Sequence, residues 1–437
     1  MLKAGFARLD VTPPLGSDLS GYFYARATSG VLDNLYLNAV AIRNDTDTVV
    51  LMAIDYIGIK LNHIIKLRKL ISEHTDVPSD HIFIASLHQH TSPCIANEDY
   101  KWTPLKDDIF LDVLYRKFAD AAVMAIDDLK DAVMSTAERE VDEPISFVRR
   151  YFTKEGGVQT NPSTSKYTLL GRCAESDNTM RLVRFAREGA NDIAIVNFST
   201  HPDVISGSKV SADWPGFTRR FVEESIENVS AIFFTGCQGD TNHIDFFKPK
   251  EERIKNDDRY YHSQFMGKTV AKAVKDVWND TKVSTNDAIF AENVTIYNKT
   301  NLEGVDEYDK YKAWYDDYEA GKLDYNPHIT ELAYARRIIE LRTSPVFNPI
   351  PLTVVGIGDA SFIGFGGEPF TAYGEAARNI APEKFVVCSV CTNGYEGYFP
   401  TEEAFSQGGY EARSSSFSPS LEKEIISALK DIFARHK

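Results

Sequence analysis

Two histidines one residue apart, His88 and His90, follow the apolar run 82–85 and begin the segment best suited to chemistry. In a strand, residues i and i+2 lie on the same face, so both imidazoles can point into one cavity where the strand ends. Imidazole is a preferred ligand of zinc and of other borderline metal ions. The pair is therefore a candidate metal site, although the pattern taken alone favours two hydrogen-bonded structural histidines.

Other segments also place polar residues directly after an apolar run, where α/β proteins commonly position their sites. His201 ends one such run and precedes Pro202, which favours an extended backbone at the histidine. The glycines of segment 236–243 predict a tight turn whose backbone amides can face a ligand. Glu368 follows two glycines, and we interpret it as either a ligand or a partner of a helix N-terminus.

Two further segments have a structural and a functional interpretation. Segment 393–401 interleaves glycines with tyrosines, which suits a loop that presents phenols to a cleft better than a core strand. Asp213 comes just before a predicted helix, and we expect it to cap that helix rather than to take part in catalysis.

Strand-like and helical patterns alternate along the chain, which is typical of an α/β protein. The predicted strands cover 48–54, 82–85, 193–198, 231–235, 352–357, 361–365 and 385–390. The predicted helices cover 61–71, 110–129, 215–226, 368–378 and 421–434. Segment 300–345 is charged and rich in tyrosine, and it predicts a peripheral helical insertion. We see no repeat and no linker, so we predict one domain over 1–437.

Composition excludes several classes of function. The formal net charge of −15 disfavours nucleic acid as a partner, and no Lys/Arg-rich stripe opposes it. No run approaches the roughly 20 apolar residues of a membrane span, so we predict no stable membrane insertion. The start of the chain lacks a signal-peptide pattern, and the five cysteines form no paired framework. We therefore expect buried, reduced thiols, including Cys388 and Cys391, and a cytoplasmic location.

Together these segments resemble the N-terminal catalytic domain of the neutral/alkaline non-lysosomal ceramidase family. The resemblance starts with segments 4–14, 19–22, 30–36 and 53–55, includes the site segments above, and ends with Tyr410-Glu411-Ala412. The resemblance rests on the order of these motifs along the chain, because no single motif is specific enough. It implies an α/β fold in which mixed β-sheets are flanked by helices.

The resemblance also implies roles for individual residues. In that family one zinc ion is held by two histidines, a glutamate and a tyrosine, which match His88, His201, Glu368 and Tyr398. The substrate-contacting groups match His90, Tyr410 and Arg149, with Arg150 beside it as the alternative register. Such a site would use a zinc-activated water against a carbonyl, with His90 and Tyr410 stabilising the oxyanion.

Two departures bear on the substrate. The family has Gly-Asp-Val-Ser-Pro-Asn where this chain has segment 239–244, so that Asn242 replaces the serine and His243 is new. A serine nucleophile is therefore disfavoured, and we expect His243 to be an acid, a base or a substrate contact. The chain ends soon after Tyr410, and we expect the C-terminal immunoglobulin-like domain of full-length ceramidases to be absent.

Three functions follow as hypotheses. The first is a zinc-dependent hydrolase that cleaves the amide bond of an N-acyl lipid. The second keeps the metal but acts on a small polar or carbohydrate-like molecule, and the third is a non-catalytic binding protein on the same fold. A long apolar channel would favour the first, whereas a short pocket rimmed by Arg149, His243 and Tyr410 would favour the second.

Overall fold

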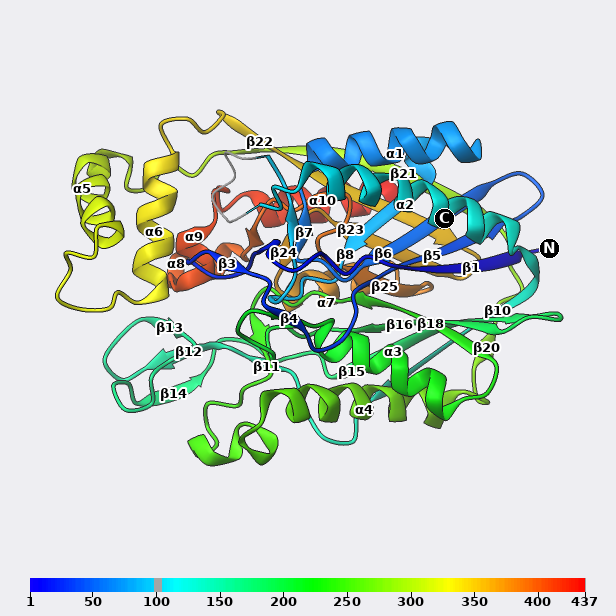
Figure 1. Cartoon of the computed structure of the whole chain (residues 1–437), viewed down its shortest axis with the longest axis horizontal. Helices are drawn as coiled ribbons and strands as arrows, with labels where there is room; N and C mark the ends of the chain where they lie inside the picture. The colour runs from blue at the N-terminus through cyan, green and yellow to red at the C-terminus, as the bar shows by residue number, and fades with distance from the viewer. Residues whose placement is uncertain (98–103, 437) are drawn as a thin grey trace.

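A computed structural model describes residues 1–97 and 104–436, and a large mixed β-sheet lies at its centre (Figure 1). Its strands are β1 (Lys3–Asp10), β5 (Tyr36–Arg43), β6 (Thr48–Ile54), β8 (Ile82–Ser86), β10 (Lys130–Glu140), β15 (Thr179–Arg187), β16 (Asp192–Phe198), β18 (Val229–Thr235) and β20 (Lys282–Val283). Their order is β18-β16-β15-β10-β1-β5-β6-β8, and β20 pairs with β10 outside this path. The pairs β6–β8 and β16–β18 are parallel, and the others are antiparallel.

A second, smaller sheet packs against the first. It consists of β21 (Ile289–Lys299), β22 (Phe347–Ile357), β23 (Ala360–Phe365) and β25 (Phe385–Ser389), of which only β23 and β25 run parallel. The ring of Phe234 in β18 contacts Phe83 of β8 edge-on at 5.7 Å between centroids, and Phe362 of β23 at 6.4 Å. These buried aromatic contacts join the two sheets through one hydrophobic core.

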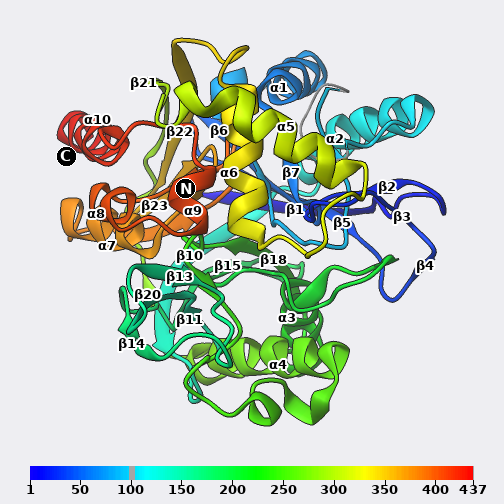
Figure 2. The same ribbon diagram turned by 90° about the vertical axis from the view of Figure 1, so that its left-hand side faces the viewer.

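Helices flank both sheets, as the mixed α/β prediction required. Helices α1 (Leu61–Thr75) and α2 (Asp108–Asp127) pack together beside β1 and β5, and α3 (Asp213–Ser225) and α4 (Arg259–Val277) cover β10, β15 and β18. Helices α7 (Thr371–Ile380) and α10 (Leu421–Arg435) cover the outer face of the smaller sheet (Figure 2). Among the described residues, none of the helices is long and apolar enough to span a membrane.

Most predicted elements are confirmed, and one helix start is wrong. The seven predicted strands match β6, β8, β16, β18, β22, β23 and β25, and Cys388 and Cys391 are buried free thiols as expected. Helix α7 begins at Thr371, three residues later than predicted, because Glu368 and Pro369 form a short strand instead. The segment 300–345 holds α5 (Tyr308–Glu319) and α6 (Ile329–Glu340), which lie at one end of the molecule in Figure 1.

A buried ion pair fixes the segment that carries the two histidines. Asp55 follows β6, and both of its oxygens accept from the Arg219 guanidinium of α3 at 2.7 and 2.6 Å. Gln89, which lies between His88 and His90, donates to Asp55 Oδ1 at 3.2 Å and to the Ala212 carbonyl at 3.2 Å. One bidentate pair thus connects a central strand, a helix and the histidine segment.

Replacing Arg219 with alanine should destabilise the protein by about 3–5 kcal/mol, because the carboxylate of Asp55 would remain buried without its partner. The matched control is Arg220→Ala, since Arg220 lies on the exposed side of the same helix and forms an exposed ion pair with Glu224. That change should cost no more than about 0.5 kcal/mol. Chemical denaturation measures both free energies of unfolding, and equal losses would contradict the role of the Asp55–Arg219 pair.

Candidate functional site

His88 and His90 converge, although the chain has already left the strand. Strand β8 ends at Ser86, and His88 has a left-handed backbone with φ of 75°. Its N–H donates to the Tyr56 carbonyl at 2.9 Å, and the two imidazole centroids lie 5.1 Å apart. The expectation that both rings face one cavity is therefore confirmed, whereas its reason, the alternation of a strand, is wrong.

His201 and Glu368 reach the same place from other parts of the fold. His201 follows β16, and its ring centroid lies 5.0 Å from that of His88. Glu368 starts β24 (Glu368–Pro369), which pairs in parallel with β26 (Tyr398–Phe399) so that Glu368 lies opposite Tyr398. The four residues predicted to hold a metal thus come together from four separate segments, with the ring of Tyr398 6.5 Å from that of His201.

Asp213 supports the His201 segment and also binds the first turn of α3. The N-cap position is Ala212, without a side-chain hydrogen bond, but Asp213 Oδ1 accepts the Trp214 N–H at 2.7 Å, so the predicted contact with the start of the helix is present. Asp213 Oδ2 accepts the backbone N–H groups of Val204 and Ile205 at 2.9 and 3.0 Å, and burial raises the pKa of Asp213 to about 6. Asp213 therefore holds the turn that follows His201.

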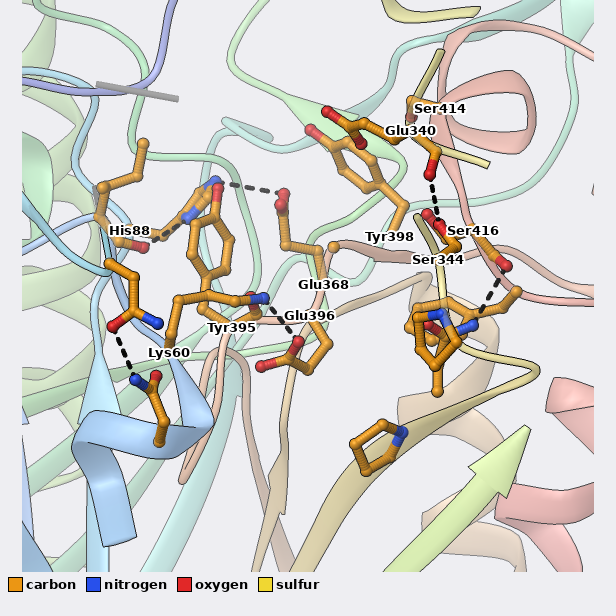
Figure 3. Close-up of a pocket in the computed structure, with 18 of the residues that line it drawn as sticks. Lys60, His88, Glu340, Ser344, Glu368, Tyr395, Glu396, Tyr398, Ser414 and Ser416 are labelled. Atoms are coloured by element: carbon orange, nitrogen blue, oxygen red, sulfur yellow. Dashed lines mark hydrogen bonds and ion pairs between the residues drawn. The ribbon is translucent and has the colours of Figure 1, made fainter. Parts of the chain in front are cut away.

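The hydrogen bonds of the two histidines determine which ring atoms face each other. His88 Nδ1 lies 2.9 Å from the Ile57 carbonyl and His201 Nδ1 lies 3.2 Å from the Gln238 carbonyl. A carbonyl oxygen only accepts, so each Nδ1 carries a proton, and in the neutral form of each ring the lone pair lies on Nε2. Those Nε2 atoms lie 3.1 Å (His88) and 3.5 Å (His201) from Glu368 Oε2 (Figure 3 shows the His88 contact).

Three buried acceptors therefore point at one another. Among the described residues, neither His201 Nε2 nor Glu368 Oε2 has a hydrogen-bond partner. Burial holds the pKa of His201 well below its ordinary value, so this ring stays neutral rather than protonated. A cation placed among the three lone pairs satisfies all of them at once, and a single proton does not. The donor set thus fits a metal ion that accepts nitrogen and oxygen ligands.

His90 completes a cluster of three histidines. The candidate ligand atoms of His88, His90 and His201 lie within 4.8 Å of one another, so these three residues could hold a metal ion. Burial lowers the pKa of His90 to about 4, and Asp203, whose Oδ1 is 3.6 Å from His90 Nδ1, acts in the opposite direction. Asp203 also accepts from the Tyr22 hydroxyl at 2.6 Å. Nothing in the sequence pattern indicated that Tyr22 and Asp203 would lie beside His90.

Arg149 lies behind the site and orients Tyr398. Its Nη2 donates to the Tyr398 hydroxyl at 3.1 Å and to the Gly239 carbonyl at 2.9 Å, and its Nε donates to Glu411 at 2.8 Å. Arg150 binds the other oxygen of Glu411 at 3.1 Å. Burial opposes a charged Arg149, but Tyr398 and Glu411 outweigh it and raise the pKa of Arg149. Sequence reasoning identified Arg149 but missed Glu411, the buried counter-charge of both arginines.

Tyr410 and His243 have different surroundings. Tyr410 begins α9 (Tyr410–Ser414), and its ring contacts that of Tyr398 edge-on with centroids 5.5 Å apart. His243 instead lies 5.5 Å from the ring of His262, in a separate small pocket that also contains Glu143. The structure thus places Tyr410 at the histidine site and keeps His243 away from it.

A cleft of about 390 Å³ connects the site to the surface. His88, His90, Glu368, Tyr398 and Tyr410 lie in its lining. Arg149 and His243 are not among the described lining residues, so these two do not form the rim that would have favoured the second hypothesis. The end of the predicted insertion contributes residues 340 and 343–345 to one wall, a role that its sequence did not indicate.

His90→Ala distinguishes two ways of holding a metal ion. If His88, His201, Glu368 and Tyr398 suffice, the purified variant should keep about as much metal as the parent after dialysis. His201→Ala is the matched control, and it should lose at least about tenfold in metal affinity. Elemental analysis of the dialysed proteins measures both. Equal metal loss in the two variants would make His90 a ligand and contradict the predicted set.

No family model matches the chain, and no curated protein sequence matches it. Its three-dimensional structure is similar to a neutral ceramidase from Pseudomonas aeruginosa, with a TM-score of 0.74, 16% identity, and coverage of 98% of this chain and 73% of the other. A ceramidase complexed with C2 matches with a TM-score of 0.73, 12% identity, and coverage of 100% and 75%. The chain therefore has the fold that makes up about three quarters of these ceramidase chains.

Proposed function

We propose that the protein is a zinc-dependent hydrolase that cleaves an amide (N-acyl) bond with a metal-activated water. The observation that carries the proposal is the convergence of the His88, His201 and Glu368 lone pairs on one buried point beside an open cleft. The solved structures with the same fold are named as ceramidases, which supports a hydrolase of that type.

The chain supplies each group that such a reaction needs. His88, His201, Glu368 and Tyr398 would hold the zinc ion, and Arg149 fixes the Tyr398 hydroxyl by a hydrogen bond while the Tyr398 ring lies 6.5 Å from that of His201. When bound, zinc lowers the pKa of a coordinated water to roughly 7 and polarises a carbonyl. The hydroxyl of Tyr410, whose pKa is raised by burial, stays protonated and can donate to the developing oxyanion.

His90 is suited to the proton transfers of the reaction. It lines the cleft, and neither ring nitrogen has a hydrogen-bond partner among the described residues. A neutral imidazole in this position can take a proton from the attacking water and return it to the leaving amine. Asp203, near Nδ1, favours the charged form that exists between these two transfers.

A serine nucleophile has no counterpart at the position where the family carries one. Asn242 lies in β19 (Thr241–Asn242), and its amide donates to Asn161 Oδ1 at 2.6 Å. It is outside the described lining of the cleft. The metal-activated water is therefore the nucleophile that these residues support.

Removal of the metal tests the proposal directly. Purified protein should hydrolyse at least one member of a panel of N-acyl amines, and a chelator should reduce this rate at least about a hundredfold. One equivalent of zinc should restore it. A rate that the chelator leaves unchanged would contradict the role of zinc. No turnover of N-acyl amines or glycosides by the zinc-loaded protein would instead favour a binding protein.

A further inference from the structure

The cleft beside the histidine site has polar walls on both sides. One side carries Lys60, and the other carries Ser344, Ser414 and Ser416 (Figure 3). Asn62 and Asn97, whose amides form a hydrogen bond of 2.8 Å, also line the cleft. In the lining, Ile57 and Phe417 are each only 1% exposed, whereas Pro345 and Pro349 add some apolar surface beside the polar groups. An alkyl chain lying here would remove water from hydroxyl, amide and ammonium groups without replacing their hydrogen bonds.

The serine-rich wall is held rigidly next to Tyr410. Arg337 of α6 is 2% exposed, and it donates to the carbonyls of Asn301, Glu303 and Arg413 at 2.9, 2.8 and 2.9 Å. These bonds attach α6, which leads into Ser344, to α9, which carries Tyr410. These contacts hold the serine side of the cleft to the residues that position Tyr410.

Glu396 has a buried acceptor oxygen that nothing in the described structure uses. Its Oε2 pairs with Lys60 Nζ at 2.5 Å, whereas its Oε1 has no hydrogen-bond partner among the described residues. The side chain is 17% exposed and lines the cleft. A buried carboxylate oxygen without a donor is costly, and a hydroxyl group of a ligand would satisfy it.

The charge of the lining limits the kind of polar ligand. With Glu368 set aside, the described lining residues carry two carboxylates, Glu340 and Glu396, and one ammonium group, Lys60. This balance disfavours a ligand that bears a carboxylate of its own. Tyr395 and Tyr398 add aromatic faces to the same cleft, which suit the C–H faces of a sugar ring.

We infer that the cleft binds a neutral polyhydroxylated group, so that the substrate is an N-acylated amino sugar rather than an N-acyl lipid. This inference rests on the proposed amide hydrolysis for the reaction, but its binding part stands on the cleft alone. Glu396 is the specificity-determining residue, because its free oxygen accepts a sugar hydroxyl. A hydroxyl-binding site rejects analogues that lack the hydroxyl because its own polar groups are left unpaired.

Matched substrates test the inference. N-acetylglucosamine and N-acetylcyclohexylamine share an acyl group and a six-membered ring, but only the first carries hydroxyls. Zinc-loaded protein should show a kcat/KM at least about a hundredfold higher for N-acetylglucosamine than for N-acetylcyclohexylamine or for N-palmitoylsphingosine in detergent. Equal or higher values for either of the latter two would overturn the inference while leaving the amide hydrolase intact.

A substitution at Glu396 locates the binding group. Glu396→Gln should raise the KM for N-acetylglucosamine about tenfold, with kcat within about twofold and no change for N-acetylcyclohexylamine. Glu383→Gln, at an exposed position outside the described lining, is the control and should change neither constant. An unchanged KM in Glu396→Gln would overturn the assigned role of Glu396.

Binding measured without turnover separates the two proposals. Calorimetry with N-acetylglucosamine on the His88→Ala/His201→Ala protein should show saturable binding that Glu396→Gln weakens about tenfold. If this binding is seen while the zinc-loaded parent hydrolyses no amide, the hydrolase is contradicted and the sugar-binding cleft is supported. If the parent hydrolyses other amides and no sugar binding is seen, the cleft inference is overturned.

Discussion

Buried lone pairs that face one another are the constraint on which the histidine site depends. The carbonyls of Ile57 and Gln238 hold the Nδ1 protons of His88 and His201, so both Nε2 lone pairs turn toward the carboxylate of Glu368. Without a cation these acceptors repel one another in a region from which water is largely excluded. The surrounding structure holds them together, which is the arrangement expected of a preformed metal site.

Two buried charge networks keep the acceptors in place. The Asp55–Arg219 pair and Gln89 hold the histidine segment against α3 and the end of β6. On the opposite side, Glu411 neutralises Arg149 and Arg150, and Arg149 in turn orients Tyr398. Buried pairs of this kind contribute little net stability compared with apolar packing, but they fix positions closely. The strained backbone of His88 agrees with a segment whose geometry is imposed by its neighbours.

The sequence predicted which residues form the site better than it predicted how the backbone positions them. The strands before His88 and His201 were recognisable because both are short apolar runs, and buried strands of an α/β protein have that pattern. The turn at His88 was not predictable, because its left-handed backbone depends on contacts with Tyr56 and Ile57 from a distant part of the chain. Glu368 forms a strand pair with Tyr398 instead of starting a helix for the same reason.

Long-range packing also explains the remaining differences. The segment 300–345 contributes to the cleft because Arg337 attaches α6 to the carbonyls of distant residues, an interaction that composition does not encode. His243 follows a predicted site loop closely in sequence, but it packs against His262 and away from the cleft. The roles that the family resemblance implies for Arg149 and Tyr410 agree with their positions beside Tyr398, and their part in a reaction stays a prediction.

Zinc titration of the metal-free protein tests the central claim most directly. Calorimetry combined with elemental analysis should find one zinc ion per chain in the parent protein. The His88→Ala/His201→Ala variant, compared at the same concentration, should bind less than about a tenth of an equivalent. Substoichiometric zinc in the parent, or a full equivalent retained by a folded double variant, would show that the converging lone pairs are not a zinc site.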